Sequence, residues 1–112
     1  MSEDHAGWLH ELPLRERRLV CAFRNAAIAL ARDSREHRHA TEENLARVTR
    51  EADRAGTLRR FWSLMATLGS EARRTIRYHV PACPCLGEDE AAFLSMCRHL
   101  RAHRQYDATC IA

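Results

Sequence analysis

The sequence predicts an all-α protein, a compact bundle of four main helices with a short fifth. The 112 residues contain only four glycines and three prolines, the two residue types that are least favourable inside helices. Apolar residues also recur at intervals of three and four along most of the chain, which is the spacing of one helix face. The length and the absence of linker-like stretches predict a single domain, 1–112, with 1–12 and 105–112 less ordered.

The first helix is expected to open at Pro13, a residue well suited to a first helical turn, and to run to about Asp33. The polar stretch 34–40 that follows is predicted to be a loop or a solvated extension of this helix. Thr41 is a good N-cap for the second helix, and Gly56 is a plausible residue for its end.

Thr57 is expected to cap a third helix that ends at Gly69 and lies at the centre of the core. Ser70 is predicted to begin the short fifth helix, and the last helix is expected to begin near Gly87 with three acids in its first turn. The side chains predicted to be buried are Leu19, Phe23, Leu30, Leu45, Phe61, Trp62, Leu68, Phe93 and Leu100.

All 18 basic residues are arginines, and the net charge is only +3. The absence of lysine is typical of codon bias in a GC-rich genome, so we expect a bacterial source. The N-terminal residues form no apolar signal segment, and no apolar run approaches the roughly 18 residues of a membrane span. We therefore expect a cytoplasmic protein without a membrane partner. Its five cysteines, an odd number, are expected to be reduced.

The segment 79–90 contains the most specific pattern in the chain. His79, Cys83 and Cys85 lie within seven residues in a proline-rich loop, and no apolar helix face accounts for the two thiols. Thiolate and imidazole are the ligands that zinc prefers, and zinc usually takes four. We therefore predict a zinc site from these three residues, with Cys97 or Cys110 as the fourth ligand. Cys97 also has the helical spacing of a core residue, so packing is the alternative interpretation for it.

Two other interpretations of the same loop are weaker. The spacing Cys-x-Cys differs from the Cys-x-x-Cys of thioredoxin-like proteins, and the following acids oppose a low thiol pKa. The dipeptide Cys83-Pro84 resembles the short Cys-Pro motif of haem-responsive regulators, which would imply haem ligation by the thiolate.

A basic region in the middle of the chain indicates an alternative function. Eight arginines and three acids lie between residues 47 and 77. Arginines on one surface can meet a phosphate backbone, so the alternative prediction is a DNA-binding regulator. The residues predicted for that contact are Arg47, Arg50, Arg54, Arg73 and Arg77.

The nine residues 12–20, Leu-Pro-Leu-Arg-Glu-Arg-Arg-Leu-Val, resemble the opening of sigma-factor region 4 and LuxR-type helix-turn-helix domains. This resemblance implies DNA binding. The chain departs from the pattern afterwards, because the helix runs on to Leu30 and no glycine-containing turn or recognition helix follows.

The sequence contains no glycine-rich phosphate loop, nucleophile elbow or His-Glu-x-x-His pattern. We therefore expect a regulatory or partner-binding protein and not an enzyme. A thin apolar face on the second helix and three large apolar residues before Pro13 are compatible with a protein partner, including a homodimer.

Overall fold

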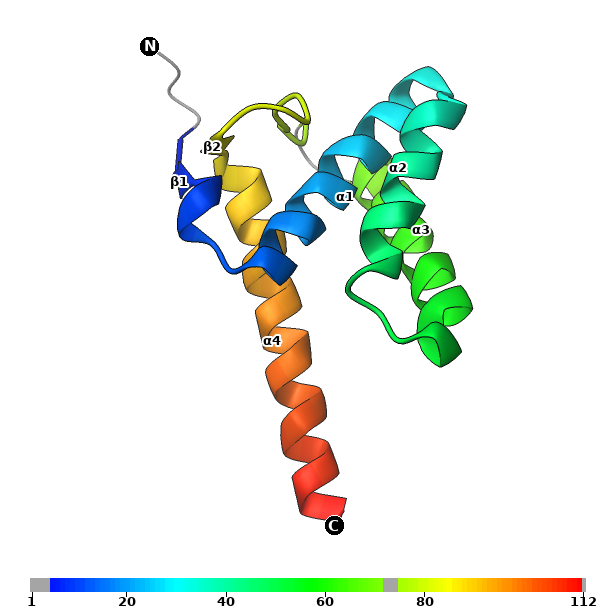
Figure 1. The fold of residues 1–112 in the computed structure, drawn as a ribbon, viewed down its shortest axis with the longest axis vertical. Helices are drawn as coiled ribbons and strands as arrows, with labels where there is room; N and C mark the ends of the chain where they lie inside the picture. Colours follow the sequence, from blue (N-terminus) through cyan, green and yellow to red (C-terminus); the bar gives the residue numbers. More distant parts are fainter. Residues whose placement is uncertain (1–4, 72–74, 112) are drawn as a thin grey trace.

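The computed structural model describes residues 5–71 and 75–111, with side chains as far as residue 102. It confirms the all-α class with four main helices. Four α-helices, two 3-10 turns and two very short strands follow one another along the described chain (Figure 1). Their order is β1 (Gly7–Trp8), a 3-10 turn (Leu9–Glu11), α1 (Leu14–Arg32), α2 (Arg35–Ala46), a 3-10 turn (Glu51–Asp53), α3 (Arg54–Glu71), β2 (Cys85–Leu86) and α4 (Glu88–Ile111).

The ends of α1 agree with the prediction because local signals mark both of them. Pro13 occupies the N-cap position, and the Arg17 N–H donates to its carbonyl at 3.0 Å. Asp33 closes the helix in the left-handed conformation, with φ 50° and ψ 46°. Aspartate adopts this conformation more readily than most residues because its short side chain can hydrogen-bond locally.

The predicted start of α2 is wrong by seven residues. Ser34, and not Thr41, is its N-cap, and the His37 N–H donates to the Ser34 hydroxyl at 3.3 Å. The polar stretch after Ser34 is therefore helical. Thr41 lies buried inside α2 and donates its hydroxyl to the His37 carbonyl at 2.8 Å. Both residues are good caps, and only the sharp turn at Asp33 selects the first.

The boundary between α2 and α3 also differs from the prediction. The second helix ends at Ala46, and α3 begins at Arg54, so Gly56 and Thr57 lie inside α3 and do not separate two helices. Arg54 donates from Nη2 to the Ala46 carbonyl at 3.2 Å, which bridges the break. A glycine inside a helix costs only about 1 kcal/mol relative to alanine, and tertiary packing can outweigh that.

The short fifth helix predicted from Ser70 is not found in the described residues. The third helix continues through Ser70 to Glu71, and the segment 75–80 has no regular secondary structure. This segment instead passes close to α4, where the Arg77 N–H donates to Asp89 at 2.6 Å.

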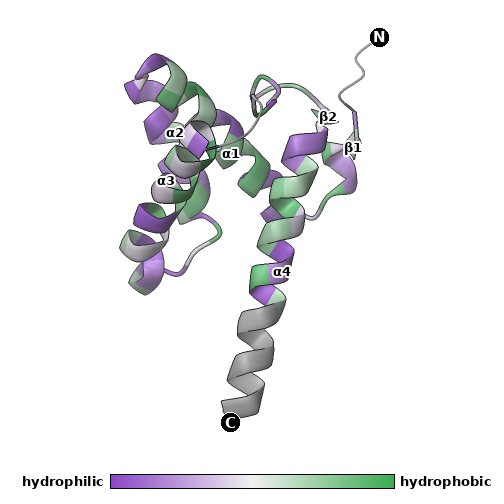
Figure 2. Cartoon of the chain, turned by 180° about the vertical axis from the view of Figure 1, so that it is seen from behind, coloured by the Kyte–Doolittle hydropathy of each residue, from purple (hydrophilic) through white to green (hydrophobic). Residues whose placement is uncertain are grey.

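The helix α1 is the common packing partner, since each of the other three helices contacts it (Figure 1). Figure 2 shows hydrophobic residues concentrated along α1 and the first half of α4. The largest core cluster joins three rings: Phe23 and Phe93 lie 4.8 Å apart between centroids, and Phe61 and Phe93 lie 6.1 Å apart. A second cluster joins Val20 and Leu94 to β2.

Burial follows the predicted set with two clear exceptions. Phe23, Leu45, Phe61 and Phe93 are buried, while Leu19, Trp62 and Leu68 are half-buried and pack against the core. Leu30 and Leu100, however, are 44% and 57% exposed. Both residues lie on the predicted helices, but Leu100 belongs to the second half of α4. This half of the helix extends past its neighbours (Figure 1).

The two short strands form an antiparallel pair in which Gly7 lies opposite Leu86 and Trp8 lies opposite Cys85. The Leu9 N–H adds a hydrogen bond to the Pro84 carbonyl at 2.9 Å. The segment before Pro13 is thereby held against the cysteine-containing loop. No described helix combines the length and apolar character needed to cross a bilayer.

The ring cluster predicts where stability resides. Phe93→Ala should lower the free energy of unfolding by about 3–5 kcal/mol, because it removes a buried ring and leaves a cavity. Leu100→Ala is the matched control on the same helix and should cost less than about 0.5 kcal/mol because its side chain is exposed. Urea denaturation followed by circular dichroism measures both values. Equal losses would contradict the assigned core.

Candidate functional site

The site is built around a buried arginine, Arg24, in the middle of α1. Its side chain is fully buried, as is that of Glu90 in the first turn of α4. The guanidinium binds the carboxylate in a bidentate manner, with Nε to Oε2 at 2.7 Å and Nη2 to Oε1 at 2.9 Å. This planar arrangement gives the strongest geometry available to a charged pair.

The loop 79–87 is folded around the same guanidinium. Arg24 Nη1 donates to the Cys83 carbonyl at 2.7 Å and lies 3.3 Å from the Val80 carbonyl, while Nη2 also donates to the Cys85 carbonyl. All five N–H groups of the arginine therefore have an acceptor. The cost of burying the charge is offset by this complete set of hydrogen bonds.

Glu90 organises the other side of the loop. Its carboxylate accepts the backbone N–H of His79 at 3.0 Å and that of Gly87 at 2.9 Å. The Gly87 contact is half of a capping box, in which an acid at the third helical position reaches back to the N-cap. The sequence had explained Glu90 only as an acid near a helix dipole, but it also anchors the start and the end of the loop.

The loop contains one tight turn. The Cys83 N–H donates to the Val80 carbonyl at 2.9 Å, which closes a four-residue turn with Pro81 in its second position. Proline is favoured there because its fixed φ matches the turn. The carbonyls of the loop point inward to Arg24, and the side chains of His79, Cys83 and Cys85 are only partly buried.

The three predicted zinc ligands of this loop are His79, Cys83 and Cys85, and the structure places the first two in contact. His79 Nδ1 and Cys83 Sγ lie 3.6 Å apart. Burial, followed by the adjacent Cys83 thiol, raises the pKa of Cys85, and Arg24 opposes this effect only weakly. The Cys85 thiol is therefore a protonated group at neutral pH. In the described part of the chain, no set of three metal-ligating side chains already has the arrangement of a metal site.

The two candidates for a fourth ligand do not join the loop. Cys97 packs against the main core cluster, and burial raises its pKa, with Arg15 and Glu16 as its charged neighbours. It lies about 13 Å along the axis from the start of α4, at 1.5 Å per residue. The side chain of Cys110 falls outside the described residues.

Sequence reasoning missed Arg24, although a signal was present. It is the only charged residue between Leu19 and Ala31, and the other residues of this stretch, except Asn25, are apolar, as expected of a buried helix. A charge in such a position is rarely left without a partner. The partner could not be found from the sequence, because Glu90 lies 66 positions away.

The arginines predicted for DNA binding do not share one helix face. Arg47 is the C-cap of α2, Arg50 lies in the following turn, and Arg54 opens α3 with its guanidinium turned to Ala46. Arg77 is exposed on the segment 75–80, which passes beside α4. Arg73 falls outside the described residues. Arg47, Arg50 and Arg54 therefore do not line one face of the second helix, because α2 ends at Ala46.

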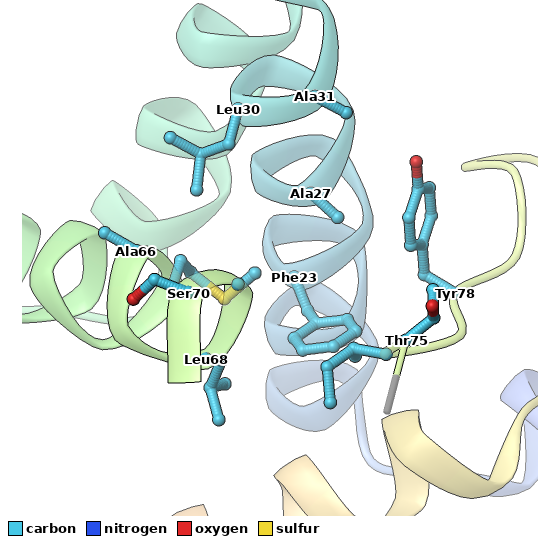
Figure 3. A pocket seen from close by; sticks show the side chains of 12 residues that line it. Phe23, Ala27, Leu30, Ala31, Ala66, Leu68, Ser70, Thr75 and Tyr78 are labelled. Carbon is cyan, nitrogen blue, oxygen red and sulfur yellow. The ribbon is translucent and has the colours of Figure 1, made fainter. Parts of the chain in front are cut away.

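An open apolar cavity of about 560 Å³ lies between α1, α3 and the segment 75–78 (Figure 3). Phe23, Leu68 and Tyr78 are among the side chains that surround it, and Leu30 lies at its edge. Cavities of this size and character are typical of binding sites. The exposure of Leu30 follows from its position beside this opening.

No family model matches the chain, and no curated protein or solved structure matches it. The function must therefore be inferred from the geometry of the molecule itself.

The buried pair yields a direct prediction. Glu90→Ala should lower the free energy of unfolding by about 3–5 kcal/mol, because it leaves the Arg24 charge buried without its carboxylate. Glu88→Ala removes the same charge from an exposed position in the same helical turn and should cost about 0.3–1 kcal/mol. Urea denaturation at neutral pH compares the two variants. A loss for Glu90→Ala no larger than that of the control would contradict the central role of the pair.

Proposed function

We propose that this chain is a small cytoplasmic regulatory protein that binds a protein partner and holds zinc in the loop 79–87. The observation that supports the zinc site is the contact between His79 and Cys83 on a loop fixed from inside by Arg24 and Glu90. A rigid loop with partly exposed thiols requires little reorganisation to take a metal.

The separation between the His79 and Cys83 side chains suits zinc. A tetrahedral ion with Zn–S near 2.3 Å and Zn–N near 2.05 Å holds its sulfur and nitrogen ligands about 3.6 Å apart, and His79 Nδ1 lies 3.6 Å from Cys83 Sγ. Cys85 would be the third ligand after a side-chain rotation. The fourth would come from water or a partner, because Cys97 is engaged in the core. The alternative interpretation of this contact is a thiol–imidazole hydrogen bond, which has a similar separation.

Zinc binding has a specific signature in this loop. The full chain, purified without chelator, should contain close to one equivalent of zinc, and Cys83→Ser or Cys85→Ser should reduce its affinity at least about ten-fold. Because the pKa of Cys85 is raised, zinc must displace a proton from that thiol, so affinity should fall as the pH is lowered from 8 to 6. Elemental analysis and competition with a chromophoric chelator measure both effects.

Cys21→Ser is the matched control for this experiment, because Cys21 lies on α1 and not in the loop. It should leave zinc content unchanged. Less than about one-tenth of an equivalent of zinc, with the loop thiols freely titratable, would contradict the metal site and favour the hydrogen bond.

The open cavity between α1 and α3 supports the partner-binding part of the proposal. Its wall is mainly apolar, and its rim exposes Leu30 and Tyr78, which are 44% and 37% accessible. Exposed apolar surface around a cavity is typical of an interaction site. The simplest partner that would cover this apolar surface is a second copy of the chain, which carries the same surface.

Self-association through the cavity predicts a monomer–dimer equilibrium in sedimentation velocity. Leu30→Glu should shift it to monomer, because a carboxylate at the rim would lose solvation in the contact. Leu100→Glu is the control, since Leu100 is also an exposed leucine but lies on α4 and does not line the cavity. A wild-type chain that stays monomeric up to about 100 µM would contradict the homodimer, given that stable dimers bind more tightly than this.

DNA binding is the second candidate function, and one observation favours it. Arg47 and Arg50 both line a single concave surface beside the start of α1. Arg15 and Arg18, which the sequence did not indicate, line this surface as well, whereas Arg54 and Arg77 do not.

A further inference from the structure

A hollow of about 430 Å³ lies between the first turns of α1 and the turn that joins α2 to α3. Four of the seven residues that line it are arginines, and none is acidic. Arg15 and Arg18 come from α1, and Arg47 and Arg50 come from the turn. The hollow lies outside the loop 79–87 and outside the apolar cavity, and neither zinc binding nor self-association involves it.

The geometry of the hollow is fixed by one of its own arginines. Arg15 donates from Nη1 to the Val48 carbonyl at 2.7 Å, which ties the turn to α1. Arg15 and Arg18 are three positions apart, so they project from the same face of α1. The turn brings Arg47 and Arg50 to the other side, so the four arginines line a common space.

Among the described residues, no acid forms an ion pair with the arginines of this hollow. Within the described chain, the arginines that form ion pairs are Arg24, with Glu90, and Arg98, with Glu16. Glu16, the acid next to Arg15, is engaged by Arg98 Nε at 2.8 Å, and that hydrogen bond lowers the pKa of Glu16. It is therefore a fully ionised partner of Arg98 and not a counter-ion for the hollow.

The start of α1 adds to the positive potential. The first intrahelical hydrogen bond runs from the Arg17 N–H to the Pro13 carbonyl. The N–H groups of the first turn therefore lack a partner within the helix and carry the positive end of its dipole. Anions bind readily at such an end when cationic side chains stand beside it.

We propose that this hollow binds a ligand with more than one phosphate group. Guanidinium groups match phosphate oxygens in a bidentate manner, and several uncompensated arginines on one concave surface require a polyanion. The phosphates could belong to a free phosphorylated compound or to a nucleic-acid backbone. Arg15 and Arg18, which the sequence did not single out, line the hollow together with Arg47 and Arg50, whereas Arg54 is turned away to Ala46.

Titration calorimetry of the full chain tests this site with two probes, inorganic tripolyphosphate and a short DNA duplex, at about 50 and 200 mM salt. The variant Arg18→Gln/Arg47→Gln removes one arginine from each wall and keeps the Arg15 contact that fixes the turn. The control Arg32→Gln/Arg35→Gln removes the same charge from exposed positions at the other end of α1, where Arg32 lies about 21 Å from Arg18 along the helix axis. Circular dichroism verifies the fold, and Arg50→Gln serves if the double variant does not fold.

Binding of either probe should weaken at least about ten-fold in Arg18→Gln/Arg47→Gln and less than about two-fold in the control. Tripolyphosphate binding with this dependence identifies a free phosphorylated compound as the ligand class. Binding of duplex alone, with a steep loss at the higher salt, identifies a nucleic-acid backbone. Failure of both probes at low salt, or equal losses in variant and control, overturns the proposal.

Discussion

The buried pair of Arg24 and Glu90 is the interaction on which the rest of the structure depends. Removing two charges from water is costly, and the cost is offset only when every donor and acceptor is satisfied. Here the arginine supplies all five N–H groups, and the carboxylate accepts two further backbone N–H groups. Helices α1 and α4 and the loop 79–87 are consequently held together at one point.

The same pair explains why the cysteine-containing loop has two different faces. Its carbonyls are directed at Arg24, so the backbone is part of the protein interior, while the thiols and the imidazole of His79 remain partly exposed. The adjoining strand pair extends this support to the N-terminal segment through Leu9 and Pro84. The loop is therefore a rigid platform, and the raised pKa of Cys85 distinguishes it from a site with a reactive thiolate.

Helix α1 contributes to each surface that could have a function. Its middle carries Arg24, its first turns form one wall of the basic hollow, and its last turns border the apolar cavity. Its three neighbours cover it only in part, since Leu30 stays exposed at one end and Leu14, at the other, is 55% exposed. A change in packing around α1 would consequently affect all three surfaces together.

The sequence by itself determined the elements whose ends carry a local chemical signal. Pro13 and Asp33 bound α1, and the three acids after Gly87 mark the start of α4. The proximity of His79, Cys83 and Cys85 also followed from the sequence, because seven residues of chain span them. These features depend on neighbours within one or two turns, which a single sequence records directly.

Only the tertiary structure decided the features that join distant positions. The partner of Arg24 lies 66 positions along the chain, and Arg15 reaches the turn at Val48. Hydrogen bonds of this kind arise when packing excludes water from a charged group and leaves it few available partners. The sequence specifies the charges, but their pairing is a property of the folded chain.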